Sequence, residues 1–249
     1  MIQDRQHCIL ELLKQQGFVS VNDFCSILYS SGATIRRDLT ELEKRGMLKR
    51  VRGGAIAFNG INSDLPLILR NNTNPESKKH IAWLAANYVN DSATLFLDSS
   101  STTRWLAQEI KDTHNVSVIT NSVESSYLLS TSSQVKVYAT GGYVRNNTTM
   151  IGSTALRMVQ DRYADIFFFS CAGLSMEHGT SETNEDSVSI KRAMFSNASQ
   201  RILLCDHSKF DMVFSYKCIN PEGINVLITD QKPPMDFIQA LPSSLKLVY

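Results

Sequence analysis

Residues 30–46 read SSGATIRRDLTELEKRG and run directly into MLKRVRGGA at 47–55. In the window 33–52, seven lysines and arginines stand against three acids, a local charge of +4 in a chain whose formal net charge is +1. Clustered cations of this kind favour a polyanionic partner, and nucleic acid is the most obvious one. The alternative is an ordinary solvated helix face.

The same stretch has the hydrophobic spacing of a helix that packs on a core. Ile35, Leu39 and Leu42 recur at i, i+4 and i+7, and Ser31 stands at the expected N-cap. The remaining polar residues of the first turns are then expected to point away from that core: Thr34, Arg36, Arg37 and Asp38.

Two shorter helical patterns precede this one. The first ends at Gly17, and the second follows Ser20 as a cap. The second and third helices are joined by a turn of a few residues, which predicts a helix-turn-helix whose last helix enters the major groove of DNA. A helical hairpin used for protein contacts is the competing interpretation.

After Gly46, the run MLKRVRGGAI has apolar residues on either side of a basic, glycine-containing tip, as in the β-hairpin wing of a winged helix. The side chains of Arg50 and Arg52 would there reach phosphates or the minor groove. The DNA-binding residues predicted from the helix and the wing are Ser31, Thr34, Arg36, Arg37, Lys49, Arg50 and Arg52.

The runs GFVSV (17–21) and ATIRRDLTELEKRGMLKRVRGGA (33–55) resemble the winged helix-turn-helix of the DeoR family of bacterial sugar-metabolism regulators, across residues 5–56. Two departures from the family pattern stand out. Tyr29-Ser30-Ser31 replaces the usual Gly-Val-Ser of the turn, and Arg52 replaces the histidine before Gly-Gly-Ala.

Length suits one large domain or a small domain joined to a medium one. We expect a DNA-binding domain at 1–56, a linker at 57–76 rich in Asn and Pro, and a larger domain at 77–249. The sequence has no apolar run of membrane-spanning length and no signal-peptide pattern, which favours a cytoplasmic protein without membrane contact. The five scattered cysteines and five histidines have no metal-ligand spacing, so we expect no metal and no cofactor.

Beyond residue 77, helical patterns alternate with apolar, β-rich runs at 94–98, 116–120, 135–140, 165–170, 201–206 and 225–230. This alternation predicts an α/β domain with a mostly parallel sheet covered by helices on both faces. The runs end in polar residues, and ligands of open α/β sheets bind at the carboxyl ends of strands. The alternative is that these polar residues only cap the following helices.

One strand end has the sequence LDSSSTT (97–103), in which a strand, a hydroxyl-rich loop and a helix start follow one another. Free N–H groups and hydroxyls at a helix start suit a phosphate, although Ser and Thr cap many helices without binding any ligand.

Seven stretches between residues 78 and 211, from LDSSSTT to LLCDHSKF, resemble the DeoR C-terminal domain in order and composition. That resemblance implies a fold similar to sugar-phosphate isomerases and a sensor of phosphorylated sugars or related metabolites. The implied effector contacts are Asp98, Ser99, Ser101, Thr102, Thr103, Thr120, Asn121, Ser122, Gly141, Gly142, Lys191, Asp206 and Lys209. Ser100 departs from the glycine usual in the family, and Cys171 and Ala172 replace a small-and-acidic pattern.

The prediction from sequence is therefore a non-enzymatic transcriptional regulator, a repressor of a carbohydrate operon that binds operator DNA and a phosphorylated sugar. One helix-turn-helix contacts only a half-site, so we expect a homo-oligomer, a dimer or a tetramer. Two alternatives remain: an isomerase-like enzyme, for which the acidic pair expected near SCAGL is absent, and a DNA-binding protein without an effector. Cys171 as a nucleophile is disfavoured because no histidine is placed beside it.

Overall fold

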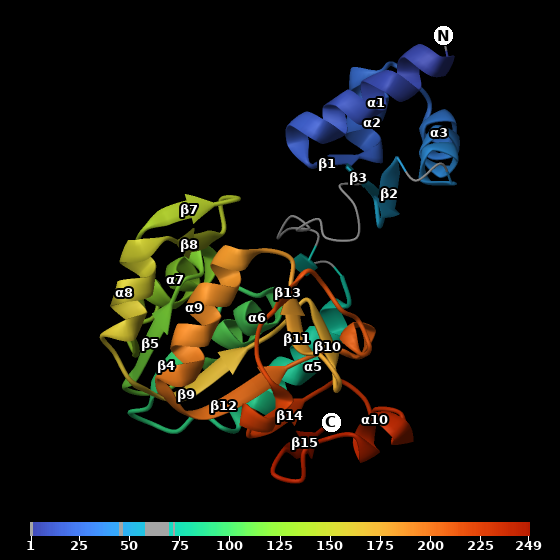
Figure 1. Cartoon of the computed structure of the whole chain (residues 1–249). Helices are drawn as coiled ribbons and strands as arrows, with labels where there is room; N and C mark the ends of the chain where they lie inside the picture. The colour runs from blue at the N-terminus through green and yellow to red at the C-terminus, as the bar shows by residue number, and fades with distance from the viewer. Residues whose placement is uncertain (1, 45–46, 58–69, 72) are drawn as a thin grey trace. The chain divides into compact units, whose positions relative to one another are not determined.

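The computed structural model describes residues 2–44, 47–57, 70, 71 and 73–249. The chain divides into two compact units, Met1–Arg70 and Asn71–Tyr249 (Figure 1). Most of the predicted linker, 57–76, lies outside the described residues, and its last two residues form the start of helix α5 (Pro75–Ala86).

The N-terminal unit is a winged helix-turn-helix. Its described residues form the elements α1 (Ile2–Gln16), β1 (Phe18–Ser20), α2 (Val21–Ile27), α3 (Gly32–Lys44), β2 (Leu48–Val51) and β3 (Gly54–Ala57). The strands form an antiparallel sheet of order β1-β3-β2, so the predicted wing hairpin is present. Ile35, Leu39 and Leu42 of α3 are buried in its core with residues of α1 and α2, which confirms the spacing argument.

The prediction for Asp38 was wrong. Its side chain is 1% exposed, and Arg5 Nε donates a hydrogen bond to Asp38 Oδ2 over 2.5 Å. Asp38 follows Ile35 by three positions, which places it on the same face of α3 as the apolar residues. A buried carboxylate requires a partner, and Arg5 of α1 supplies the compensating charge.

The turn between α2 and α3 contains an unusual backbone conformation. Tyr29 has φ 48°, in the left-handed region that a glycine adopts without strain, and its side chain is 96% exposed. Tyr29, which stands where the family pattern has glycine, therefore adopts this left-handed conformation at a cost of about 1 kcal/mol.

Two consecutive glycines shape the wing for different reasons. Gly53 has φ +85° at the hairpin turn, with open space where a Cβ would stand. A Cβ on Gly54 would lie 2.4 Å from the carbonyl oxygen of Val19 and 2.5 Å from Cε2 of Phe18. Gly54 therefore allows β3 to approach β1 closely.

The C-terminal unit is the predicted α/β domain. Its helices are α5, α6 (Ser101–Ile110), α7 (Val123–Ser130), α8 (Ser153–Gln160), α9 (Glu185–Ser196) and α10 (Met235–Gln239), with short 3-10 turns η1 (His207–Lys209) and η2 (Pro221–Gly223). The strands of the main sheet are β4 (Thr94–Leu97), β5 (Val116–Thr120), β6 (Val135–Ala139), β9 (Ala164–Phe169), β12 (Ala198–Leu204), β14 (Val226–Ile228) and β15 (Lys246–Val248). The smaller strands are β7 (Tyr143–Arg145), β8 (Thr149–Ile151), β10 (Gly173–Ser175), β11 (Gly179–Glu182) and β13 (Tyr216–Lys217).

The main sheet has the order β15-β14-β12-β9-β4-β5-β6, and all its strand pairs are parallel. Six of its strands coincide with the predicted runs. The seventh, β15, was not predicted, because only three residues of it pair at the edge of the sheet. From β4 the chain proceeds to β5 and β6 on one side, and it then crosses to β9 and β12 on the other.

Helices cover both faces of this sheet, as predicted (Figure 1). Phe167 and Phe169 of β9 pack in a core with residues of α8 and α9, whereas Ile166 and Phe168 pack in a second core with residues of α5, α6 and α7. The strand alternation therefore places neighbouring residues of β9 in opposite cores. No helix in the described part of the chain is long and apolar enough to cross a membrane.

Candidate functional site

The direction of strand addition reverses between β4 and β9, which lie side by side at the centre of the sheet. Open α/β sheets bind ligands at this position, beyond the carboxyl ends of the strands. Here the polar residues Asp98 and Ser170 follow β4 and β9 directly, and Ser170 N donates to Asp98 Oδ2 over 3.1 Å. The candidate site therefore lies where the topology predicts a ligand.

Asp98 is almost fully buried and accepts several hydrogen bonds. Its Oδ1 accepts from Ser100 N at 3.0 Å and from Thr103 Oγ1 at 2.8 Å, in addition to the bond from Ser170. Burial acts to raise the pKa of Asp98, but the nearby Lys191 ammonium and these hydrogen bonds outweigh burial and lower the pKa below its ordinary value. Asp98 is thus held as a carboxylate.

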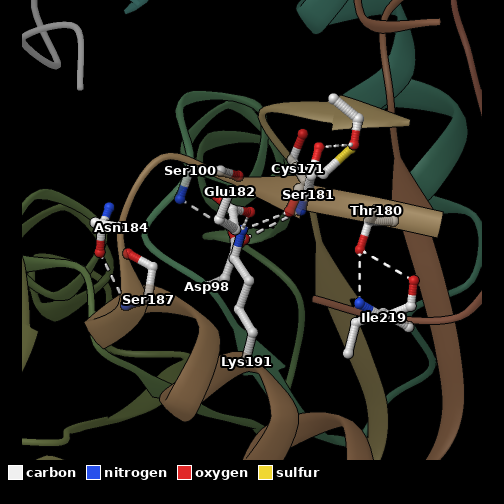
Figure 2. A network of polar contacts seen from close by, with 12 residues as sticks. Asp98, Ser100, Cys171, Thr180, Ser181, Glu182, Asn184, Ser187, Lys191 and Ile219 are labelled. Atoms are coloured by element: carbon white, nitrogen blue, oxygen red, sulfur yellow. Dashed lines mark hydrogen bonds and ion pairs between the residues drawn. The ribbon is translucent and has the colours of Figure 1, made fainter. Parts of the chain in front are cut away.

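Lys191 of α9 lies against Asp98 and a second buried acid, Glu182 at the end of β11 (Figure 2). Lys191 Nζ is 3.0 Å from Asp98 Oδ2, donates to the Ser170 carbonyl oxygen at 2.6 Å, and donates to Glu182 Oε1. Burial acts to lower the pKa of Lys191, but Glu182 and Asp98 outweigh burial and raise the pKa. For Glu182 burial is the larger effect and raises the pKa despite Lys191.

A second ion pair, between Lys209 and Asp206, lies beside the ion pairs of Lys191. Lys209 Nζ donates to Ser170 Oγ at 2.8 Å and lies 3.6 Å from Asp206 Oδ2. Asp206 Oδ1 also accepts from Ser208 N at 3.2 Å and from Asn74 Nδ2 at 3.3 Å. Because Ser170 contacts both lysines, it joins the two ion pairs into one network.

The first predicted loop is built as a helix cap. Ser100 Oγ accepts from Thr103 N at 3.2 Å, so Ser100 caps α6. Thr102 and Thr103 are fully buried, Ser101 is nearly so, and Ser99 is partly buried. Thr102 Oγ1 has no hydrogen-bond partner in the described structure, which leaves a buried polar atom at the helix start unsatisfied.

The second predicted loop follows β5, the strand next to β4. Ser122 caps α7 by accepting from Ser125 N at 3.1 Å, and Thr120 Oγ1 accepts from Ser122 N. Asn121 Nδ2 donates to the Met150 carbonyl oxygen, but Asn121 Oδ1 is buried without a partner in the described structure. Gly141 and Gly142 lie between β6, a strand of the main sheet, and β7, the first strand of the hairpin that follows it.

The structure therefore gathers Asp98, Lys191, Asp206 and Lys209 into one network, with the α6 and α7 starts on adjacent strand ends. Sequence reasoning missed Glu182, because β11 is short and polar and does not resemble a strand. It also missed Asn74, whose contact with Asp206 spans much of the chain. An acid at the end of the GTSE run was the one available signal for Glu182.

The cysteines near the network are buried thiols. Cys171 Sγ and Cys205 Sγ lie 4.0 Å apart, and burial raises the pKa of Cys205 well above its ordinary value. Burial likewise raises the pKa of Cys218 to about 12. Thiols in this state are poor nucleophiles. Within the described residues, no group of three His, Cys, Asp or Glu side chains is placed to hold a metal ion.

In the N-terminal unit, the side chains predicted to bind DNA lie at the surface of α3 and the wing. Ser31 caps α3 by accepting from Thr34 N at 3.2 Å, while Arg36, Arg37, Lys49 and Arg52 are exposed. A cleft of about 270 Å³ lies between α2, α3 and the wing. Its lining is Val21, Asn22, Arg36, Leu39, Arg50, Val51, Gly53 and Gly54.

Arg50 is held between the wing and the helix. Its Nη1 donates to Thr40 Oγ1 at 2.6 Å, and its backbone N–H donates to Glu43 Oε1 at 2.8 Å. These two hydrogen bonds hold the β2 strand of the wing against α3. One of them already uses an N–H group of the Arg50 guanidinium.

Comparison with known proteins gives matches over nearly the whole chain. The DeoR-like helix-turn-helix domain matches residues 5–60, and the DeoR C-terminal sensor domain matches residues 73–231. The transcriptional regulator GolR of Listeria innocua is 33% identical, over 92% of this chain and 91% of GolR.

Other relatives are named either as repressors or as activators. The transcriptional repressor GlcR of Bacillus subtilis is 31% identical, over 96% of this chain and 92% of GlcR. The L-fucose operon activator of Haemophilus influenzae is 31% identical, over 92% of each chain. Among solved structures, ribose 5-phosphate isomerase A of Methanocaldococcus jannaschii aligns over 55% of each chain, with 16% identity and a TM-score of 0.42.

Proposed function

Because this chain belongs to the DeoR family of transcriptional regulators, we propose that it is a repressor of a carbohydrate-metabolism operon whose operator binding is modulated by a phosphorylated sugar. The observation that carries the effector part of the proposal is the site at the β4/β9 reversal. There, a buried network of lysines and carboxylates lies beside two helix starts, where the Thr102 and Asn121 oxygens have no hydrogen-bond partner among the described residues.

The chemistry of this site suits a sugar that carries a phosphate. The start of α6 offers backbone N–H groups and a positive helix-dipole end to an anion. Within the described part of the chain, the buried oxygens of Thr102 and Asn121 lack hydrogen-bond partners, and they would gain them from sugar hydroxyls. The effector contacts proposed are those predicted from sequence. Among them, Lys209 of the η1 turn supplies a positive charge.

Operator DNA would be bound by α3 and the wing. Arg36 and Arg37 are exposed on α3, and Lys49 and Arg52 are exposed on β2 and the hairpin turn. These four cations carry the interface in our proposal, with Arg50 positioned by Thr40 and Glu43. Since one unit contacts a half-site, we propose a homo-oligomer that binds a symmetric operator.

An isomerase-like activity is the second candidate, because the network contains both lysines and carboxylates. General base catalysis needs a carboxylate that is free to accept a proton. Asp98 instead accepts bonds from three protein groups and lies against Lys191, which favours a binding role. Turnover assays on aldose and ketose phosphates would detect the enzyme.

The test joins operator and effector in one experiment. Genome-wide footprinting gives the operator and the adjacent genes, and a thermal-shift panel of pentose and hexose phosphates gives the effector. Titration of the operator with and without that sugar phosphate should then change the operator affinity, and the operator should change the effector affinity by the same factor. An operator affinity that is unchanged at saturating sugar phosphate would leave a DNA-binding protein without an effector.

The sign of regulation needs a separate measurement. Expression of a reporter gene placed behind the footprinted operator should rise when the gene that encodes this protein is deleted. Lower reporter activity in the deletion strain would make the protein an activator, as the name of the fucose relative indicates for that protein.

A further inference from the structure

The Lys191 ammonium is surrounded by protein oxygens, with two hydrogen bonds and one further ion pair. An ammonium has three N–H groups. Three oxygens surround Nζ within hydrogen-bond distance, those of the Ser170 carbonyl, Asp98 and Glu182. While both acids are ionised, an effector anion can contact Lys191 only if one of these partners withdraws.

The network also has no excess of positive charge. Lys191 and Lys209 are outnumbered by Asp98, Glu182 and Asp206, and the buried Lys78, which lies near enough to lower the pKa of Asp206, brings the sum to zero. A phosphate would therefore enter a buried region that is neutral at best, where an uncompensated charge is costly. Protonation of one of the three acids would directly offset negative charge that the phosphate brings.

Glu182 is the acid least stabilised as an anion. Asp98 accepts from Ser100, Thr103 and Ser170, and Asp206 accepts from Ser208 and Asn74. Among the described residues, the one hydrogen bond recorded to the Glu182 carboxylate comes from Lys191. Burial raises the pKa of Glu182 above its ordinary value, in contrast to the two aspartates.

We propose that Glu182 takes up one proton from solvent when an anionic effector binds, and that the neutral acid releases an N–H of Lys191 to the anion. The carboxylate and the proton become a carboxylic acid, and no other bond changes. The charged or titratable groups that face Glu182 are Lys191 of α9, Asp98 after β4, Lys209 of η1 and Cys218 after β13. The inference rests on the proposed function, because it requires an anionic effector.

Sulfate is a suitable probe, because it stays a dianion at neutral and alkaline pH and any proton taken up then belongs to the protein. Calorimetry of sulfate binding at pH 8, in two buffers with different heats of ionisation, measures that proton uptake. The full-length parent should take up about one proton per chain, and its sulfate affinity should fall up to about tenfold per pH unit. Glu182→Gln should take up none and bind sulfate with a flat pH profile.

Glu185→Gln is the matched control, since Glu185 is exposed in the first turn of α9 and should leave the uptake at the parent's value. Uptake that persists in Glu182→Gln, or sulfate binding without uptake, would overturn the inference and leave the proposed function intact. If Glu182→Gln does not fold, a parent affinity that is flat with pH would overturn it equally well. If neither sulfate nor any sugar phosphate binds, the proposed effector class fails and the inference fails with it.

Discussion

Lys191 Nζ lies 3.0 Å from Asp98 Oδ2, so the cation of α9 is directly joined to the carboxylate that follows β4. Both side chains are buried, and Glu182 contacts the same ammonium. Removing the cation would leave two acids in a region from which water is largely excluded. The network should therefore be sensitive to the loss of any one member.

Lys191→Met should lower the free energy of unfolding by about 3 to 5 kcal/mol, because a broken buried ion pair leaves uncompensated charge. Urea unfolding at pH 7 measures this loss. Lys136→Met, at an exposed position of β6, is the control and should change stability by less than about 0.5 kcal/mol. Equal stability of the two variants would mean that water reaches the network.

Arg36→Ala combined with Arg37→Ala should weaken operator binding, since both guanidinium groups are exposed on the recognition helix α3. Each arginine that contacts a base should cost about 1 to 3 kcal/mol and relax specificity, whereas each phosphate contact should reduce the salt slope by about 1. Operator titrations at several salt concentrations separate these outcomes. Arg157→Ala on α8 is the control, and parent-like affinity of the folded double variant would exclude the assignment.

Tyr29→Gly should be more stable than Tyr29→Ala by about 1 kcal/mol, because φ at this position is 48° and glycine is unstrained there. Thermal and urea unfolding of the pair give the difference. The same pair at Glu41, exposed within α3, should show the opposite sign, since glycine is the poorer helix former. Matching signs at the two positions would show that Tyr29 carries no strain.

Ser100→Ala should lower the free energy of unfolding by about 1 kcal/mol and Ser100→Gly by only a few tenths, since Ser100 caps α6. The family glycine suggests that Ser100→Gly tightens phosphate binding. The Ser100 hydroxyl instead lies 2.9 Å from Thr103 Oγ1, so we expect an unchanged sulfate affinity in calorimetry. Tighter binding by the glycine variant would show that the side chain obstructs the anion, and Ser189→Ala on α9 serves as the control.

Local periodicity was enough to predict most of the fold. Ile35, Leu39 and Leu42 fall at helical spacing, and neighbouring residues of β9 fall in opposite cores, because these patterns depend on neighbours in the sequence. The prediction for Asp38 was wrong because a charged side chain usually lies at the surface, whereas the position of Asp38 on the core-facing side of α3 and its pairing with Arg5 keep it buried.

The sequence predicted a set of site residues, but it did not predict which of them form ion pairs and hydrogen bonds with one another. The strand ends that carry Asp98 and Asp206 could be identified from the sequence, since polar residues follow apolar runs there. The pairing of Lys191 with Glu182 depends on how α9 packs behind β11, which no local pattern encodes. For the same reason, sequence alone could not show that three protein oxygens surround the Lys191 ammonium.

The two glycines of the wing would respond differently to random mutagenesis. At Gly53 the constraint is a backbone angle with free space around it, so a selection for folded protein should also recover asparagine, which tolerates that angle. At Gly54 the constraint is contact with Val19 and Phe18, and every other side chain begins with the atom that collides. Codon 54 should therefore return glycine alone, so that the presence of a hydrogen atom in place of a methyl group sets the mutational tolerance at this position of the wing.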